Sequence, residues 1–150
     1  MEKLLTYMLT YQKKNNIKGE CFSNALMFYD IMEQQIDSCR FVTGILHYYD
    51  TKLKNNVLVC HSWCQVNGVD VETSYEYKSV PYQKTYFPTL NAYFKKYSMT
   101  LEDKKKLIDI VANFEIKARK CIENPKMVSK YYQELRSYLL TVPISKKKIE

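Results

Sequence analysis

The sequence is poor in the two residues that most often interrupt regular structure, with only three glycines and four prolines among 150 residues. This scarcity excludes a loop-rich scaffold and favours long helices and strands. No stretch approaches the ~20 consecutive apolar residues that a transmembrane helix requires. The hydrophobic fraction of 46% is nevertheless enough for a folded core, which excludes a chain that is disordered throughout.

The chain also lacks the marks of a secreted protein. It begins Met1-Glu2-Lys3, with no apolar stretch that could serve as the core of a signal peptide. Its five cysteines are an odd number without a tight pairing pattern, whereas small secreted domains are usually held by paired cysteines. We therefore expect a cytoplasmic (intracellular) protein with reduced thiols and no membrane partner.

An excess of basic residues gives the chain a formal net charge of +7. This charge is compatible with binding to nucleic acid or another anionic surface. The lysines lie in separate clusters rather than in one basic arm, which favours solvated faces over a nucleic-acid footprint. Nucleic acid is therefore a partner that the sequence allows but does not favour. The clusters are residues 13–14, 95–96, 104–106 and 146–148.

Hydrophobic periodicity divides the chain into helices, a small sheet and a helical end. Apolar residues at three-four spacing predict helices, and β-branched or aromatic runs predict strands that pair as an antiparallel meander. The polar residues 50–56 and the proline-containing residues 78–88 are expected to be connections. The predicted helices span residues 3–14, 21–35, 89–97, 100–122 and 126–140, and the predicted strands span residues 41–49, 57–66 and 69–77.

These elements predict an α+β fold. N-terminal helices pack on a small antiparallel sheet of three or more strands, and a helical C-terminal section follows. The length is that of one domain. The pair Asn67-Gly68 is the strongest short signal for a hairpin turn. We expect a single domain over residues 1–150, made of a core (1–88), a helical extension (89–142) and a basic tail (143–150).

Cys21 is the first residue of the second predicted helix, and Gly19 just before it allows the chain to turn sharply. The unpaired amides and the positive dipole end of a helix N-terminus stabilise a thiolate. The same amides can hold the oxyanion of a tetrahedral intermediate. Cys21 is therefore the candidate nucleophile, and a buried cysteine that packs as a small hydrophobic residue is the simpler alternative.

The predicted hairpin brings a histidine and several polar residues together. With the turn at residues 67–68, odd-numbered residues of one strand share a face with even-numbered residues of the next. Glu72 is then a diagonal neighbour of His61, where a carboxylate would fix the tautomer of the ring. Ser74, directly opposite His61, and Asp70, nearer the turn, are alternatives for this third member of the site. We rank them after Glu72.

Other residues have weaker claims to a role. Trp63 and Asn24 are candidates for the substrate cleft, and core packing is an equal alternative for Trp63. His47 is expected to be structural or exposed. Cys60 and Cys64 share one strand face while His61 lies on the other, so they cannot complete a tetrahedral metal site. We predict no metal and no cofactor, and expect both cysteines to pack under the C-terminal helices.

At these residues the chain resembles the papain-like and transglutaminase-like cysteine hydrolases. Members of this superfamily place a cysteine at the start of a helix, a histidine on a following strand and an acid on the next strand. Residues 61–63 (His-Ser-Trp) match the His-x-Trp pattern of the transglutaminase-like branch. Residues 71–74 match its apolar-Asp-Pro-Thr pattern in register, with Glu for Asp and Thr for Pro. The resemblance implies Cys21 as nucleophile, His61 as base and Glu72 as orienting acid.

The resemblance covers residues 19–77 and implies a cysteine hydrolase or acyltransferase. Such an enzyme acts on an amide bond, peptide or isopeptide, in a protein or peptide substrate through an acyl-enzyme. Its oxyanion hole often includes a polar side chain upstream of the nucleophile, for which Gln12, Asn15 and Asn16 are candidates. The alternatives are a non-catalytic basic module that binds nucleic acid or a host protein, and a degenerate member of the superfamily.

Overall fold

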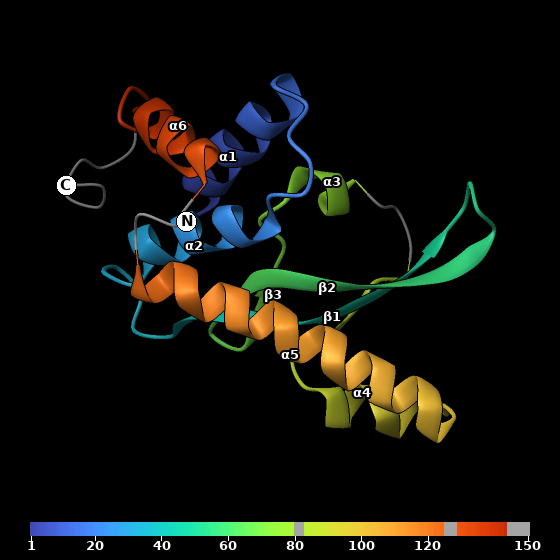
Figure 1. Ribbon diagram of the computed structural model, residues 1–150. Coiled ribbons are helices and arrows are strands. Elements are labelled where there is room, and N and C mark those ends of the chain that lie inside the picture. The colour runs from blue at the N-terminus through green and yellow to red at the C-terminus, as the bar shows by residue number, and fades with distance from the viewer. Residues whose placement is uncertain (80–82, 125–128, 144–150) are drawn as a thin grey trace. The chain divides into compact units, whose positions relative to one another are not determined.

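A computed structural model describes residues 1–79, 83–124 and 129–143, and it has the α+β fold that the sequence predicts (Figure 1). Helices come first, a four-stranded sheet follows, and the C-terminal part is helical. The helices are α1 (Glu2–Lys14), α2 (Cys21–Met32), α3 (Tyr75–Lys78), α4 (Leu90–Lys96), α5 (Leu101–Glu123) and α6 (Lys130–Leu139). The strands are β1 (Cys39–Asp50), β2 (Asn55–Val66), β3 (Val69–Val71) and β4 (Thr85–Phe87).

The strand order in the sheet is β3-β2-β1-β4. Strand β3 pairs antiparallel with β2, with Val66 opposite Val69 and Gln65 opposite Asp70, as the hairpin signal predicts. The intervening Asn67 and Gly68 have φ values of 52° and 79°, and two successive positive φ values are what a type I′ turn requires. The register near the turn therefore follows from the sequence.

The third strand is shorter than expected. The sequence predicts it over residues 69–77, whereas β3 ends at Val71 and the chain enters the short helix α3. The backbone N–H of Ser74 donates to Glu72 Oε2 at 3.1 Å, and a local bond of this kind competes with ladder pairing. The predicted positions of Ser74 opposite His61 and of Glu72 diagonal to it therefore lie beyond the end of the β2–β3 ladder.

Two other connections differ from the expectation. The first turn of the sheet occupies residues 51–54, so Asn55 and Asn56 belong to β2 rather than to the connection. Within the expected loop 78–88, Thr85–Phe87 forms strand β4, which pairs antiparallel with β1. Its β-branched and aromatic residues are good strand formers, but a run of three is too short for the periodicity to detect.

Hydroxyl side chains cap the N-termini of helices α4, α5 and α6. Thr100 is the N-cap of α5, and its hydroxyl accepts a hydrogen bond from the Asp103 N–H at 3.1 Å, the bond of a capping box. Thr89 caps α4 in the same way. The last helix begins at Lys130, with Ser129 as N-cap. The expected start at residue 126 and the residues 144–150 of the expected basic tail lie outside the described residues.

Contacts divide the chain into two compact units. The first unit comprises Met1–Val42, Ser62–Ser79 and Val128–Glu150. The second unit comprises Thr43–His61 and Val80–Met127. Helix α6 thus belongs with α1 and α2, whereas α4 and α5 belong to the other unit. The expected helical extension 89–142 is therefore divided between the two.

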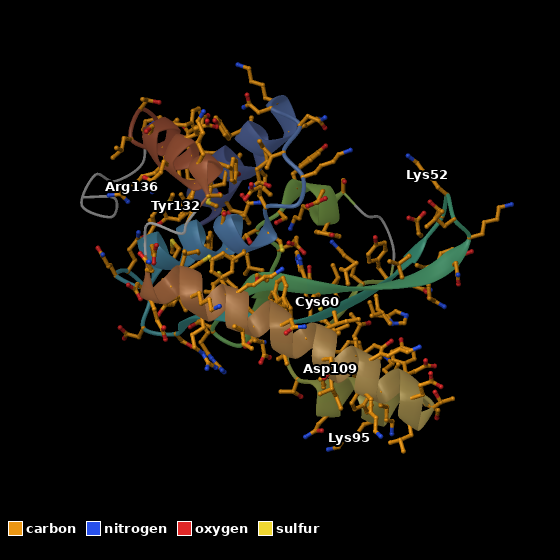
Figure 2. The ribbon with its side chains drawn as sticks, in the orientation of Figure 1. Lys52, Cys60, Lys95, Asp109, Tyr132 and Arg136 are labelled. Atoms are coloured by element: carbon orange, nitrogen blue, oxygen red, sulfur yellow. The ribbon has the colours of Figure 1, made fainter. Side chains whose placement is uncertain are left out.

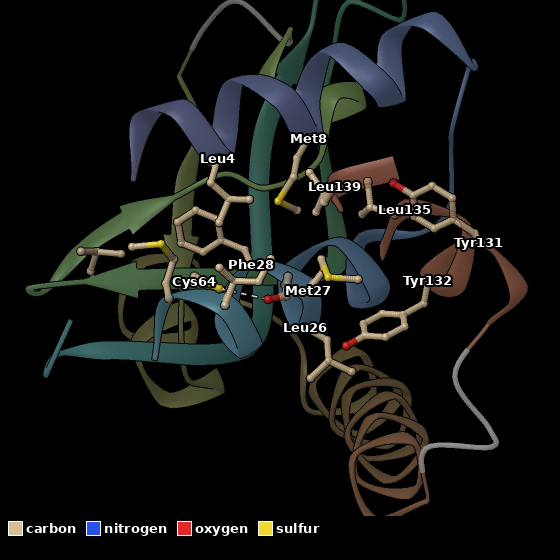
Figure 3. Close-up of a cluster of buried hydrophobic side chains, with 14 residues drawn as sticks. Leu4, Met8, Leu26, Met27, Phe28, Cys64, Tyr131, Tyr132, Leu135 and Leu139 are labelled. Carbon is tan, nitrogen blue, oxygen red and sulfur yellow. Dashed lines mark hydrogen bonds between the residues drawn. The ribbon is translucent and has the colours of Figure 1, made fainter. Parts of the chain in front are cut away.

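The first unit has a core made by α1, α2, α6 and the C-terminal end of β2 (Figure 3). Helix α2 is apolar on most of its circumference, and its residues 23–28 are all buried. Leu4 and Met8 of α1 and Leu135 and Leu139 of α6 pack into the same cluster. The Cys64 thiol also lies in this cluster and donates to the Ala25 carbonyl of α2 at 3.3 Å, so this contact is with an N-terminal helix, and its expected position under the C-terminal helices stays a prediction.

Polar contacts also fix α6 on α2. The Tyr132 hydroxyl donates to Asp30 Oδ2 at 2.6 Å, and Figure 2 shows Tyr132 and Arg136 on α6. Desolvation by burial raises the pKa of the Asp30 carboxyl, although the Tyr132 hydrogen bond acts in the opposite sense. The folded protein therefore holds the Asp30 proton to a higher pH than the unfolded chain does.

Asp30→Asn is therefore expected to change the pH dependence of stability. An acid whose pKa is raised on folding makes the protein less stable as the pH rises from its ordinary pKa through its folded pKa. Asparagine keeps an acceptor for Tyr132 but does not titrate. Urea unfolding should show the wild type losing stability relative to Asp30→Asn as the pH rises above about 4, the ordinary pKa of an aspartate. A constant difference between the two proteins would contradict this expectation.

The second unit has a smaller core of its own. Ile45 of β1, Phe87 of β4 and Leu107 and Val111 of α5 are among its buried residues, and Cys60 packs against them. Cys60 is labelled on β2 in Figure 2. The expectation that Cys60 packs beneath a C-terminal helix is thus confirmed. Among the described residues, no helix is both long enough and apolar enough to cross a membrane.

Candidate active site

Cys21 is the first residue of α2 and its thiol is half-buried. The helix starts after Gly19, whose φ of 71° lies in the left-handed region that favours glycine. The first backbone bond of the helix runs from the Asn24 N–H to the Glu20 carbonyl at 2.9 Å. The amides before Asn24 have no intrahelical acceptor, so the thiol stands at an end of α2 where a negative charge is stabilised.

The residues around Cys21 are fixed by bonds to distant segments of the first unit. The Gly19 N–H donates to Glu76 Oε1 of α3 at 2.8 Å. Glu20 Oε2 accepts from the Ser23 hydroxyl at 3.0 Å and from the Ser129 hydroxyl at 3.1 Å. Because one partner comes from α3 and another from the cap of α6, the chain entering α2 is held in one conformation.

Glu72 lies just beyond the end of β3 and is only 3% exposed. A buried carboxylate needs hydrogen-bond donors or a cation to offset its lost hydration. One such donor is the backbone N–H of Ser74, at 3.1 Å from Oε2. Because it is buried, Glu72 differs from an ordinary acidic residue on the exposed face of a strand.

Asn24 connects the helix of Cys21 to the segment of Glu72. It follows Cys21 by three residues, so the two lie on the same side of α2. Its Nδ2 donates to the Ser74 hydroxyl oxygen at 3.1 Å across 50 residues of sequence. Asn24 is 2% exposed. Its observed contacts are therefore with the interior, and its contact with a substrate stays a prediction.

Gln12 of α1 also holds this segment. Its Nε2 donates to the Thr73 carbonyl at 2.9 Å, and its Oε1 accepts from the Tyr75 N–H at 2.7 Å. Gln12 is 1% exposed, so it is a buried side chain that fixes residues 73–75 by two hydrogen bonds. Asn15, another candidate upstream of Cys21, is exposed and donates to the Tyr11 carbonyl.

Asp70, an alternative to Glu72 for the third member of the site, has other partners. Its Oδ1 accepts from the Trp63 indole N–H at 2.8 Å and from Gln65 Nε2 at 3.0 Å. Trp63 is fully buried. The structure therefore has Trp63 packed in the interior, which is the alternative to a place in the substrate cleft. Asp70 therefore serves to satisfy the one polar atom of a buried indole.

His61 lies in β2 and is fully buried. It is the last residue of the Thr43–His61 part of the second unit, whereas Cys21 and Glu72 belong to the first. The structure thus brings the helix that begins at Cys21 and the segment that contains Glu72 together within one unit. The meeting of the His61 ring with the Cys21 thiol stays a prediction.

His47 has a structural environment in the second unit, one of the two roles expected for it. Its ring stacks on Tyr97 with centroids 4.4 Å apart and planes 2° from parallel. Its Nδ1 is 3.4 Å from the Tyr93 hydroxyl. Among the described residues, no group of three or more His, Cys, Asp or Glu side chains is arranged to hold a metal ion.

Sequence reasoning missed one residue that touches this network, Tyr131 of α6. Its hydroxyl donates to Asn24 Oδ1, 107 residues away in the sequence. The periodicity of α6 identifies Tyr131 as an inward-facing residue, but no pattern in the sequence names its partner. Comparison of the chain with protein-family models, with curated proteins and with solved structures finds no match.

Proposed function

We propose that the protein is a cysteine hydrolase or acyltransferase that acts on an amide bond in a protein or peptide substrate. Cys21 is the nucleophile, His61 the general base and Glu72 the acid that orients the imidazole. The assignment follows the resemblance of these residues to the papain-like and transglutaminase-like enzymes. It requires the imidazole of β2 to reach the mouth of α2.

One observation supports the proposal most directly. Helix α2, which begins at Cys21, is hydrogen-bonded through Asn24 to Ser74, and Ser74 in turn donates its N–H to Glu72. A nucleophile and an acid that act in one reaction need fixed relative positions. Both bonds are buried, where water competes least for their donors and acceptors.

The chemistry that we propose begins with proton transfer from the Cys21 thiol to the imidazole. The thiolate attacks the carbonyl carbon, and the electron pair of the C=O bond moves to oxygen. First-turn amides of α2 stabilise this oxyanion. The intermediate collapses, the C–N bond breaks, and the leaving amine takes the proton from the imidazolium. Water or an amine then attacks the thioester and regenerates the thiol.

Glu72 suits the third role better than its two alternatives. A carboxylate stabilises the imidazolium by charge, whereas the hydroxyl of Ser74 offers only a dipole. The Ser74 oxygen already accepts a bond from Asn24, and Asp70 Oδ1 already accepts two bonds. Glu72 is also the only one of the three that is both buried and an acid.

The direct test is covalent labelling by a thiol-directed acyl probe. The wild type should accumulate a thioester at Cys21, and Cys21→Ala should lose this label while unfolding at the same urea concentration. Cys121→Ala is the matched control, because it removes another half-buried thiol, on α5, and should label as the wild type does. Equal labelling of Cys21→Ala and the wild type would overturn the proposed function.

A further inference from the structure

Tyr131 lies in the first turn of α6 and is 7% exposed. Its hydroxyl donates to Asn24 Oδ1, while Asn24 Nδ2 donates to the Ser74 hydroxyl. The three side chains thus form one buried chain of hydrogen bonds, and each comes from a different part of the first unit. This chain ends at the residue whose N–H binds the Glu72 carboxylate.

The bond from Tyr131 decides how the Asn24 carboxamide is oriented. A phenol that donates to one end of a carboxamide requires the oxygen at that end, which leaves the NH₂ group at the other. Desolvation by burial raises the pKa of the Tyr131 phenol, so the hydroxyl remains a donor in neutral solution. Without this donor, the oxygen of Asn24 has no fixed partner and the amide can rotate away from Ser74.

We propose that Tyr131 is a positioning residue of the active site, which acts through Asn24 and Ser74 on the segment that carries Glu72. The inference rests on the proposed function. It gives the C-terminal helix α6, which the family resemblance does not cover, a part in the reaction. Tyr131 itself need not touch the substrate or the reacting atoms.

The chain offers a matched control in the adjacent residue. Tyr132 is 8% exposed, lies on the same helix and also donates its hydroxyl to α2, but its acceptor is Asp30, which lies nine residues beyond Cys21. Tyr132→Phe therefore removes a buried hydroxyl of the same kind without touching Asn24 or Ser74. A loss of activity due only to weaker docking of α6 would appear in both variants.

The experiment compares the rates at which Cys21 takes up the acyl probe in Tyr131→Phe, Tyr132→Phe and the wild type, after urea unfolding has confirmed that all three are folded. We expect Tyr131→Phe to slow labelling by about 10- to 100-fold, the scale of a small misplacement of reacting groups. Tyr132→Phe should stay within about twofold of the wild type. Equal labelling rates for Tyr131→Phe and Tyr132→Phe would overturn the positioning role of Tyr131 and leave the proposed function standing.

A double-mutant comparison shows whether the effect passes through Ser74. If Tyr131 acts by this route, Ser74→Ala should slow labelling, and adding Tyr131→Phe to it should slow labelling little further. If the double variant were slowed by the product of the two separate effects, the route from Tyr131 through Ser74 would be overturned. The Asn24 side-chain NH₂ resonances give a readout that does not depend on activity, because both single variants should shift them. A wild-type Cys21 that takes up no probe would overturn the proposed function and this inference together.

Discussion

Asparagine in place of His61 is expected to slow the alkylation of Cys21 by about 100-fold at about pH 6. An ordinary thiol is only about 0.3% ionised at this pH, and the thiolate is the reactive form. In the proposed site the imidazolium stabilises the Cys21 thiolate, so the wild type should react well below the range in which free thiols do. His61→Asn removes this stabilisation and keeps a polar side chain of similar size.

The measurement is iodoacetamide labelling over a range of pH, followed by mass spectrometry of the peptides, because five thiols compete for the reagent. His47→Asn is the matched control, since His47 is also buried and lies in the same unit. It should leave the rate at Cys21 unchanged although it removes the stack on Tyr97. A His61→Asn protein that reacts like the wild type at every pH would show that the imidazole does not activate the thiol.

The parts of the fold that the sequence predicts well are those encoded by adjacent residues. The Asn67-Gly68 turn needs two positive φ values, and these two residues adopt them readily. The Thr100 cap needs a hydroxyl and an N–H three residues apart. In both cases the residues that determine the structure lie within one turn, so a short stretch of sequence contains all the information.

The end of β3 could not be predicted in this way. Val71, Glu72 and Thr73 continue the pattern of a strand, yet the chain leaves the sheet after Val71. The segment is held by Gln12 and Asn24, which lie 61 and 50 residues away from the atoms that they bind. Such long-range bonds override local strand preference, and no pattern in one sequence reports them.

The candidate site divides along the same line. The sequence identifies Cys21 at the start of a predicted helix and Glu72 within a predicted strand, and the structure places both residues in one unit. The sequence does not identify the side chains that position Cys21 and Glu72. Tyr131 reads as one tyrosine among fourteen, and only the folded arrangement shows that its hydroxyl meets Asn24.

Leu135→Ala is expected to destabilise the protein by about 2–5 kcal/mol, the range for a buried leucine whose removal leaves a cavity. Leu135 is fully buried in the cluster formed with α1 and α2, so α6 should belong to the core of the first unit rather than to an extension. A loss of this size is a large part of the roughly 5–15 kcal/mol that stabilises a typical domain.

Leu140→Ala supplies the comparison, because Leu140 is the C-cap residue of α6 and is 51% exposed. Truncating it should change the free energy of unfolding by less than about 0.5 kcal/mol. Urea titrations of both variants, followed by tryptophan fluorescence, report on the first unit because Trp63 is buried there. If Leu135→Ala unfolded with the same midpoint as Leu140→Ala, α6 would contribute little to that core, and the route from Tyr131 to Glu72 would lose its rigid support.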